Sequence, residues 1–92
     1  MKSTLKILFA DDDFKYSLVL KRFLEREGYE VTYTGNGTMA LKQFPVVKPD
    51  LVLLDINMPG LNGFEVAEKI REQDRHVSVS YTHLTLPTIC SV

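Results

Sequence analysis

Short apolar runs alternate along this chain with amphipathic segments, and this alternation restricts the possible folds more than any other feature. Each apolar run has the length and composition of a strand, whereas each amphipathic segment places apolar residues at three- and four-residue steps, as a helix does. The strand-like segments are residues 6–10, 29–34 and 50–55, and the helix-like segments are residues 14–27, 38–44 and 64–72. This order predicts an α/β fold with parallel strands and right-handed helical crossovers.

Individual residues indicate where these elements begin and end. Asp12 or Asp13 provides an N-cap for the first helix, and Gly28 stops that helix. Pro45 is expected to close the second helix. Residues 29–34 alternate with period two, which is typical of a half-buried edge strand, whereas residues 50–55 show no alternation and predict a central strand covered on both faces.

Aspartates follow two of the predicted strands. Asp11, Asp12 and Asp13 come directly after the first strand, and Asp55 ends the third. Open parallel sheets bind ligands at the carboxyl ends of their strands, so these carboxylates would converge there if the two strands are neighbours. Because converging carboxylates repel one another, they indicate a bound cation such as Mg²⁺, beside which an aspartate could accept a phosphoryl group. The alternative is that Asp13 caps a helix, its favoured role, and that Asp55 caps a turn.

Composition excludes several classes of protein. Ninety-two residues suit one domain. Eleven basic against twelve acidic residues give a net charge of −1, which argues against a domain whose main role is to bind nucleic acid or anionic lipid. The longest early apolar runs, residues 7–10 and 51–54, are too short for a transmembrane helix or a signal peptide. The single cysteine, Cys90, cannot form an internal disulfide, so we expect a cytoplasmic protein.

Two stretches of sequence carry a more specific signal. They are ILFADDD at residues 7–13 and PDLVLLDINMPGLNGFE at residues 49–65. With Gly28 after the first helix and the Asn-Gly pair at residues 36–37, they resemble the receiver domain of two-component response regulators over residues 1–75. The resemblance implies an open, doubly wound parallel sheet of the flavodoxin-like or CheY-like type, with strand order 2-1-3-4. It also implies a phosphorylatable signalling module and not an enzyme.

The resemblance implies a role for each matching residue. Asp55 matches the phospho-accepting aspartate, and Asp11 and Asp12 match the acidic pair that binds Mg²⁺ with Asp55 and the backbone carbonyl of Asn57. The loop that shapes the pocket is matched by Met58, Pro59 and Gly63. The implied partner is a sensor histidine kinase, although a small phosphodonor could substitute. Many relatives carry a DNA-binding domain after the receiver, which implies transcription regulation by the intact protein, whereas this fragment is expected to bind neither nucleic acid nor membrane.

The end of the chain departs from the family pattern. A receiver has five βα units, but this chain ends during the fourth, so the sheet is expected to lack the fifth unit. The family's hydroxyl-bearing switch residue falls on Tyr81 or Thr82, and sequence register does not decide between them. The family's essential lysine has no counterpart, because the last lysine is Lys69.

Residues 76–92 also differ in composition, since none of them is charged. Residues 79–88 resemble the translation of an adapter used in DNA sequencing libraries, so we expect a partial receiver at residues 1–77 and a non-native tail at residues 78–92. A divergent natural tail and a frameshift are the alternatives. Val77, Val79 and Tyr81 alternate, so the segment could still form a strand beside the third. The incomplete fold predicts self-association through exposed apolar surface. The spacing of His76, His83 and Cys90 matches no usual zinc site.

Three functional hypotheses follow from these patterns. The first is a receiver module phosphorylated on Asp55. The second is a receiver-shaped interaction module that is not competent for phosphorylation, because the lysine and the output face are missing. The third and least favoured is a phosphatase of the haloacid-dehalogenase type, whose Asp-x-Asp spacing is present at Asp11 and Asp13 but whose usual Thr or Val is replaced by Lys15.

Overall fold

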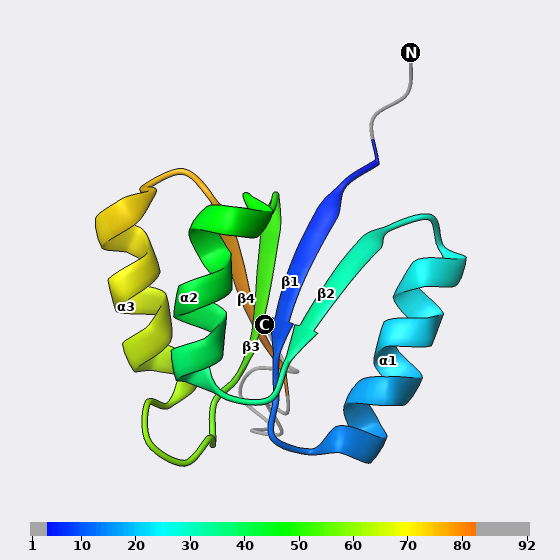
Figure 1. Cartoon of the computed structure of the whole chain (residues 1–92), viewed down its shortest axis with the longest axis horizontal. Helices are drawn as coiled ribbons and strands as arrows, with labels where there is room; N and C mark the ends of the chain where they lie inside the picture. The colour runs from blue at the N-terminus through cyan, green and yellow to red at the C-terminus, as the bar shows by residue number, and fades with distance from the viewer. Residues whose placement is uncertain (1–3, 83–92) are drawn as a thin grey trace, which may run out of the picture.

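Strands and helices alternate regularly through residues 4–82, the part of the chain that the computed structural model describes (Figure 1). The elements are β1 (Lys6–Ala10), α1 (Phe14–Arg26), β2 (Glu30–Thr34), α2 (Gly37–Val47), β3 (Leu51–Asp55), α3 (Gly63–Gln73) and β4 (Ser78–Thr82). This order confirms the α/β class predicted from the sequence. Among the described residues, no helix is long and apolar enough to cross a membrane.

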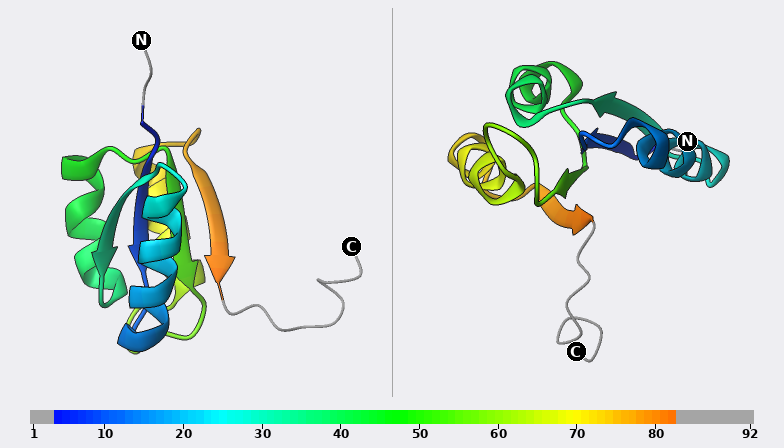
Figure 2. Two further views of the ribbon diagram at one scale, coloured as in Figure 1. Left: turned by 90° about the vertical axis from the view of Figure 1, so that its right-hand side faces the viewer. Right: turned by 90° about the horizontal axis from the view of Figure 1, so that it is seen from below.

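The four strands form one parallel sheet in the order β2-β1-β3-β4. This is the strand order that the resemblance implied, and it makes β1 and β3 neighbours, with Ala10 opposite Leu54. Helices α2 and α3 cover one face of the sheet and α1 covers the other (Figure 2). All strands therefore end at the same edge, where the polar residues of interest lie.

Most of the core lies between the sheet and the pair of helices α2 and α3. Leu8 and Ala10 of β1 and Val52 and Leu54 of β3 are fully buried there, against a set of side chains from both helices: Ala40, Phe44, Val66, Ala67 and Ile70. A smaller cluster under α1 contains Ile7, Phe9 and Val31. Because both strands contribute to the larger cluster, their carboxyl ends are held at a fixed spacing.

Two predictions about the elements were wrong. Helix α2 does not close at Pro45 but continues to Val47 and ends at Lys48, which adopts a left-handed conformation with φ of 53° and donates its N–H to Phe44 at 3.0 Å. Strand β3 is not covered on both faces, because Leu51 and Leu53 are only half-buried on the side of α1. A single helix on that face does not extend over the full width of the sheet (Figure 2).

Strand β4 lies within the segment that composition assigned to the tail. It pairs in parallel with β3, and Val79 and Tyr81 pack against the larger core cluster. Their alternation with Ser78, Ser80 and Thr82 is thus the alternation of a strand with one face on the core. The residues His83 and Cys90 lie outside the described part of the chain.

Candidate metal centre at the carboxyl edge of the sheet

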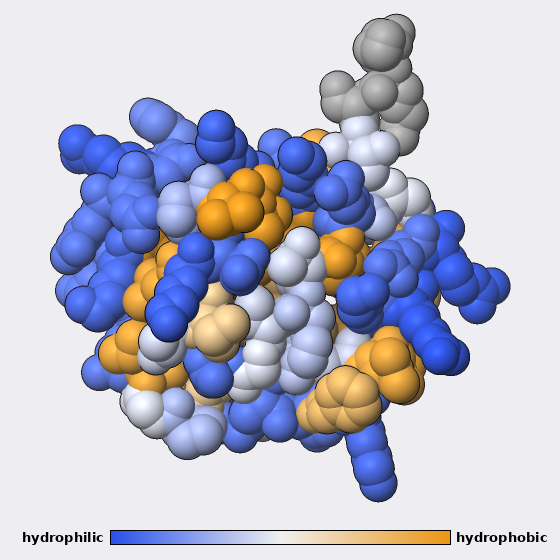
Figure 3. Space-filling model, viewed as in Figure 1, coloured by the Kyte–Doolittle hydropathy of each residue, from blue (hydrophilic) through white to orange (hydrophobic). Residues whose placement is uncertain are grey.

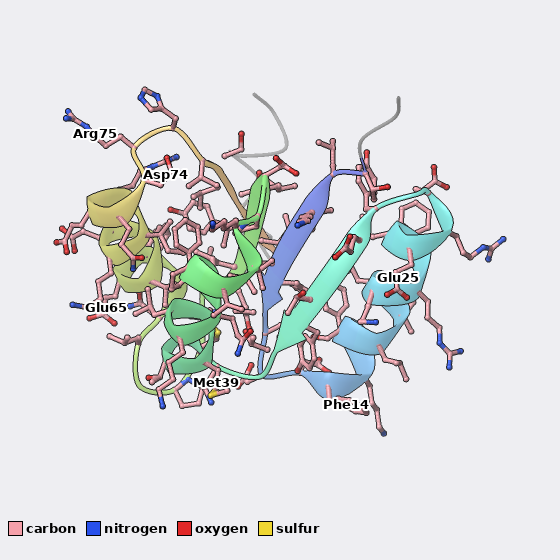
Figure 4. All side chains as sticks on the ribbon, turned by 45° about the horizontal axis from the view of Figure 1, so that its top comes forward. Phe14, Glu25, Met39, Glu65, Asp74 and Arg75 are labelled. Carbon is pink, nitrogen blue, oxygen red and sulfur yellow. The ribbon has the colours of Figure 1, made fainter. Side chains whose placement is uncertain are left out.

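Three aspartates meet where β1 and β3 end. Asp11 and Asp12 follow the last residue of β1, Asp55 ends β3, and the parallel pairing of these strands brings the three carboxylates together. One carboxylate oxygen from each residue lies within 4.8 Å of the others. Figure 4 shows Phe14 and Met39, near the starts of α1 and α2, at this end of the sheet, and Asp74 and Arg75 at the opposite end.

The burial of the three carboxylates differs in a way that suits a cation. Asp11 and Asp55 are buried, with 0% and 4% of their surfaces exposed, whereas Asp12 is exposed. Backbone amides provide part of their hydrogen bonding, since Asp13 N–H donates to Asp11 Oδ1 at 2.8 Å and Asn57 N–H donates to Asp55 Oδ1 at 3.2 Å. Mg²⁺ prefers a few carboxylate oxygens and keeps some of its water. Two buried ligands and one at the solvent boundary fit that requirement.

The fourth aspartate of the sequence has a structural role. Asp13 is the N-cap of α1, and its Oδ1 accepts the N–H of Tyr16 at 3.1 Å. It is not one of the three carboxylates that meet at the site. This placement confirms the helix-capping role favoured for Asp13, and it removes the second aspartate that the phosphatase hypothesis requires.

The loop after β3 holds the backbone of Asp55 in place. Met58 is buried in the core, and Gly63 N–H donates to the carbonyl of Ile56 at 3.1 Å. A Cβ atom on Gly63 would lie 2.5 Å from the carbonyl oxygen of Asp55, so only glycine allows α3 to begin this close to the end of β3. At this start of α3, the side chain of Asn62 accepts the N–H of Glu65 and the side chain of Glu65 accepts the N–H of Asn62, which together form a capping box. Pro59 and Asn57 are exposed.

Thr82 lies beside Asp55, which the sequence alone did not establish. In the β3–β4 register Thr82 is opposite Asp55, whereas Tyr81 is opposite Leu54 and faces α3, with its ring 4.9 Å from that of Phe64. The hydroxyl oxygen of Thr82 is buried and has no hydrogen-bond partner among residues 4–82. A buried hydroxyl without a partner costs about 1–3 kcal/mol, and this one belongs to the residue of β4 that lies opposite Asp55.

Tyr33 is a residue of this site that the sequence analysis missed. Its hydroxyl donates to the backbone carbonyl of Asp11 at 2.6 Å, and its ring packs 5.7 Å from Phe9 and 6.4 Å from Phe14. The carbonyl of Thr34 accepts the N–H of Asp11 at 3.2 Å. The end of β2 therefore fixes both backbone groups of Asp11. The pattern of an edge strand shows that Tyr33 is half-buried but not which backbone group its hydroxyl reaches.

Replacing Tyr33 with phenylalanine is expected to weaken Mg²⁺ binding by about two- to fivefold, because one hydrogen bond worth about 1 kcal/mol no longer holds Asp11 in place. Isothermal titration calorimetry with MgCl₂ measures this change. Tyr29→Phe is the matched control, since Tyr29 lies just before β2, at the amino-terminal ends of the strands and away from the three carboxylates. Equal affinities in the Tyr33→Phe protein and the parent would contradict this positioning role.

Comparison with known proteins gives a consistent match. The family model described as "Response regulator receiver domain" matches residues 7–84. The chain is 43% identical over 68 residues to the alkaline phosphatase synthesis transcriptional regulatory protein PhoP of Bacillus subtilis, a match over 74% of this chain and 28% of that protein. It is 35% identical over 74 residues to sporulation initiation phosphotransferase F of the same organism, over 80% and 60% of the two chains. It thus spans less than two thirds of these relatives.

Solved structures have the same fold as this chain. The chemotaxis protein CheY4 of Vibrio cholerae has a TM-score of 0.84 and 27% sequence identity, with 97% of this chain and 77% of that chain covered. The response regulator protein TrrA of Thermotoga maritima, solved in complex with Mg²⁺ and BeF, has a TM-score of 0.81 and 30% identity, with 96% and 95% covered.

Proposed function

Because this chain belongs to the response regulator receiver domain family, we propose that it accepts a phosphoryl group on Asp55 from a sensor histidine kinase, with Mg²⁺ bound by Asp11, Asp12 and Asp55. The observation that carries the proposal is the convergence of these three carboxylates at the carboxyl edge of the sheet. The backbone carbonyl of Asn57 is the remaining proposed ligand. The backbone N–H of the same residue, Asn57, donates a hydrogen bond to Asp55 Oδ1.

The proposed transfer is a nucleophilic displacement at phosphorus. A carboxylate oxygen of Asp55 attacks the phosphorus of a phosphohistidine, the P–N bond breaks, and its electron pair returns to the imidazole nitrogen, which leaves an acyl phosphate on Asp55. Mg²⁺ bound at the three carboxylates would neutralise charge on the phosphoryl oxygens. We expect the buried hydroxyl of Thr82, which lies opposite Asp55 in the strand register, to donate a hydrogen bond to the new phosphoryl group, while the Tyr33 hydroxyl holds Asp11 in position.

The surface beside the site supports a protein as the phosphoryl donor. Helix α1 begins immediately after the acidic loop and exposes several apolar side chains, among them Phe14 with 63% and Val19 with 69% of their surfaces accessible. Figure 3 shows apolar side chains gathered on the surface over the first part of this helix. Exposed apolar patches of this kind mark contact surfaces for other proteins.

The direct test is phosphorylation by acetyl phosphate followed by intact-protein mass spectrometry. We expect Mg²⁺-dependent addition of one phosphoryl group to the parent and none to an Asp55→Asn variant. No added phosphate on the parent would instead favour the receiver-shaped interaction module, the second candidate.

Replacing Asp12 with asparagine is expected to lower Mg²⁺ affinity by about tenfold, since it removes one of three charged ligands. Calorimetric titration with MgCl₂ measures the loss. Asp13→Asn is a matched control: it makes the same change in charge at the next position, and asparagine preserves the N-cap of α1. Unchanged affinity in the Asp12→Asn protein would exclude Asp12 as a ligand.

A further inference from the structure

The loop between β3 and α3, residues 56–62, carries the backbone carbonyl that is proposed as a Mg²⁺ ligand. Because that carbonyl belongs to the backbone of Asn57, its position depends on the path of the loop and not on the rotamer of a side chain. Mg²⁺ requires nearly ideal octahedral geometry with ligand distances of about 2.0–2.1 Å, so even a small displacement of the loop weakens its binding. The contacts that hold this loop in place therefore help to determine the affinity of the site.

Gly37, the first residue of α2, packs directly against this loop. A Cβ atom at Gly37 would lie 2.9 Å from the carbonyl oxygen of Leu61 and 3.2 Å from the Cβ of Leu61. Figure 1 shows the start of α2 beside the loop. Gly37 is buried, and Leu61 packs against the larger core cluster. The missing side chain at residue 37 thus lets the backbone of α2 begin in contact with the backbone of the loop.

Gly37 has a second close neighbour on α3. The same Cβ would lie 2.5 Å from Cγ2 of Val66, which is buried. That methyl group is the end of a side chain, whereas the carbonyl oxygen of Leu61 belongs to the backbone and gives way only if the loop moves. Among the described glycines, positive φ angles occur at Gly28 and Gly60 and not at Gly37. Space, and not backbone conformation, therefore requires glycine at residue 37.

We propose that Gly37 is a positioning residue for the metal site. By letting α2 begin against Leu61, it holds the loop where the Asn57 carbonyl can reach an ion bound by the three carboxylates. Gly37 acts through Leu61 and not on the metal itself. This role rests on the proposed function, because it requires the Asn57 carbonyl to be a ligand.

Replacing Gly37 with alanine is expected to weaken Mg²⁺ binding by roughly tenfold, while the affinity for Ca²⁺ changes by about twofold or less. Ca²⁺ accepts a flexible coordination shell at about 2.3–2.6 Å, so a displaced carbonyl costs it less than it costs Mg²⁺. A variant that was merely less well folded would lose affinity for both ions by the same factor. Isothermal titration calorimetry of the parent and the variant, with MgCl₂ and separately with CaCl₂, measures the ratio of the two affinities.

Two further variants separate the contacts of Gly37. In Gly37→Ala/Val66→Ala the methyl group at 2.5 Å is gone and the contact with the Leu61 carbonyl remains, so the ratio of Mg²⁺ to Ca²⁺ affinity should stay low. This double variant also carries the test if Gly37→Ala alone does not fold. Val66→Ala by itself is the control and should keep the ratio of the parent. Equal losses for both ions in Gly37→Ala, or a ratio restored to that of the parent in the double variant, would overturn the positioning role.

The same titrations distinguish a failure of this role from a failure of the proposed function. If the parent binds Mg²⁺ and Asp12→Asn weakens the binding, but Gly37→Ala keeps the ratio of the parent, only the role of Gly37 is wrong. If the parent does not bind Mg²⁺, the metal site and the role of Gly37 are both excluded.

Discussion

Replacing Asp55 with asparagine is expected to stabilise the metal-free protein while abolishing its stabilisation by Mg²⁺. Three carboxylates lie within 4.8 Å of one another and Asp55 is buried, so removing its charge relieves repulsion worth about 1–2 kcal/mol. For a chain of this size that corresponds to an increase in Tm of about 5–10 °C. Melts followed by circular dichroism, with EDTA and with saturating Mg²⁺, measure both effects.

Asp50→Asn is the control for this experiment. Asp50 lies just before β3, at the amino-terminal ends of the strands, where its Oδ2 accepts the N–H of Lys6 at 2.8 Å. The same change in charge there should leave the response to Mg²⁺ intact. The interpretation fails if Mg²⁺ raises the Tm of the Asp55→Asn protein as much as that of the parent. It also fails if the metal-free variant is less stable than the parent.

Replacing Gly63 with alanine is expected to destabilise the protein by about 3 kcal/mol. The added Cβ would lie 2.5 Å from the carbonyl oxygen of Asp55 and 3.0 Å from its carbonyl carbon. Both are backbone atoms of β3 and cannot rotate away as a side chain would, so α3 must move away from the sheet. Urea unfolding at equilibrium measures the loss.

Gly35→Ala is the matched control for Gly63→Ala. A Cβ on Gly35 would meet only the Tyr33 hydroxyl at 3.9 Å, which is ordinary contact, so we expect a change within about 0.5 kcal/mol. Gly63→Ala should also weaken Mg²⁺ binding in any molecules that remain folded, because the shift occurs at the backbone of Asp55. Equal stabilities of the two variants would contradict the close approach of α3 to β3.

The convergence of the acids was predictable because it depends on topology. Asp11 and Asp55 each end an apolar run, and parallel strands all end at one edge, so strand order was the only further information needed. Likewise the cap of α1 at Asp13 follows from local chemistry. These features depend on a residue and its immediate neighbours, or on a rule that holds for every open parallel sheet.

The features that were not predictable depend on contacts between distant segments. The contact of the Tyr33 hydroxyl with the Asp11 carbonyl joins residues 22 positions apart, and no local pattern reports it. Which of Tyr81 and Thr82 lies opposite Asp55 depends on the register of β4 on β3. Helix α2 continued past Pro45 because packing of Phe44 in the core outweighs the local preference to stop there. The half-buried side of β3 depends on how far one helix extends across the sheet.

The position of each strand in the sheet sets how easily each part of the site opens. Asp11 and Asp12 follow β1, which lies between two strands and whose Leu8, Phe9 and Ala10 are fully buried, so local unfolding there requires nearly global unfolding. Thr82 ends β4, which with β2 is one of the two edge strands of the sheet that residues 4–82 form, and an edge strand opens locally at a lower free energy than a central one. The carboxylates are thus fixed on the slowest-exchanging part of the molecule, while the hydroxyl beside them is carried by a segment that can fluctuate separately.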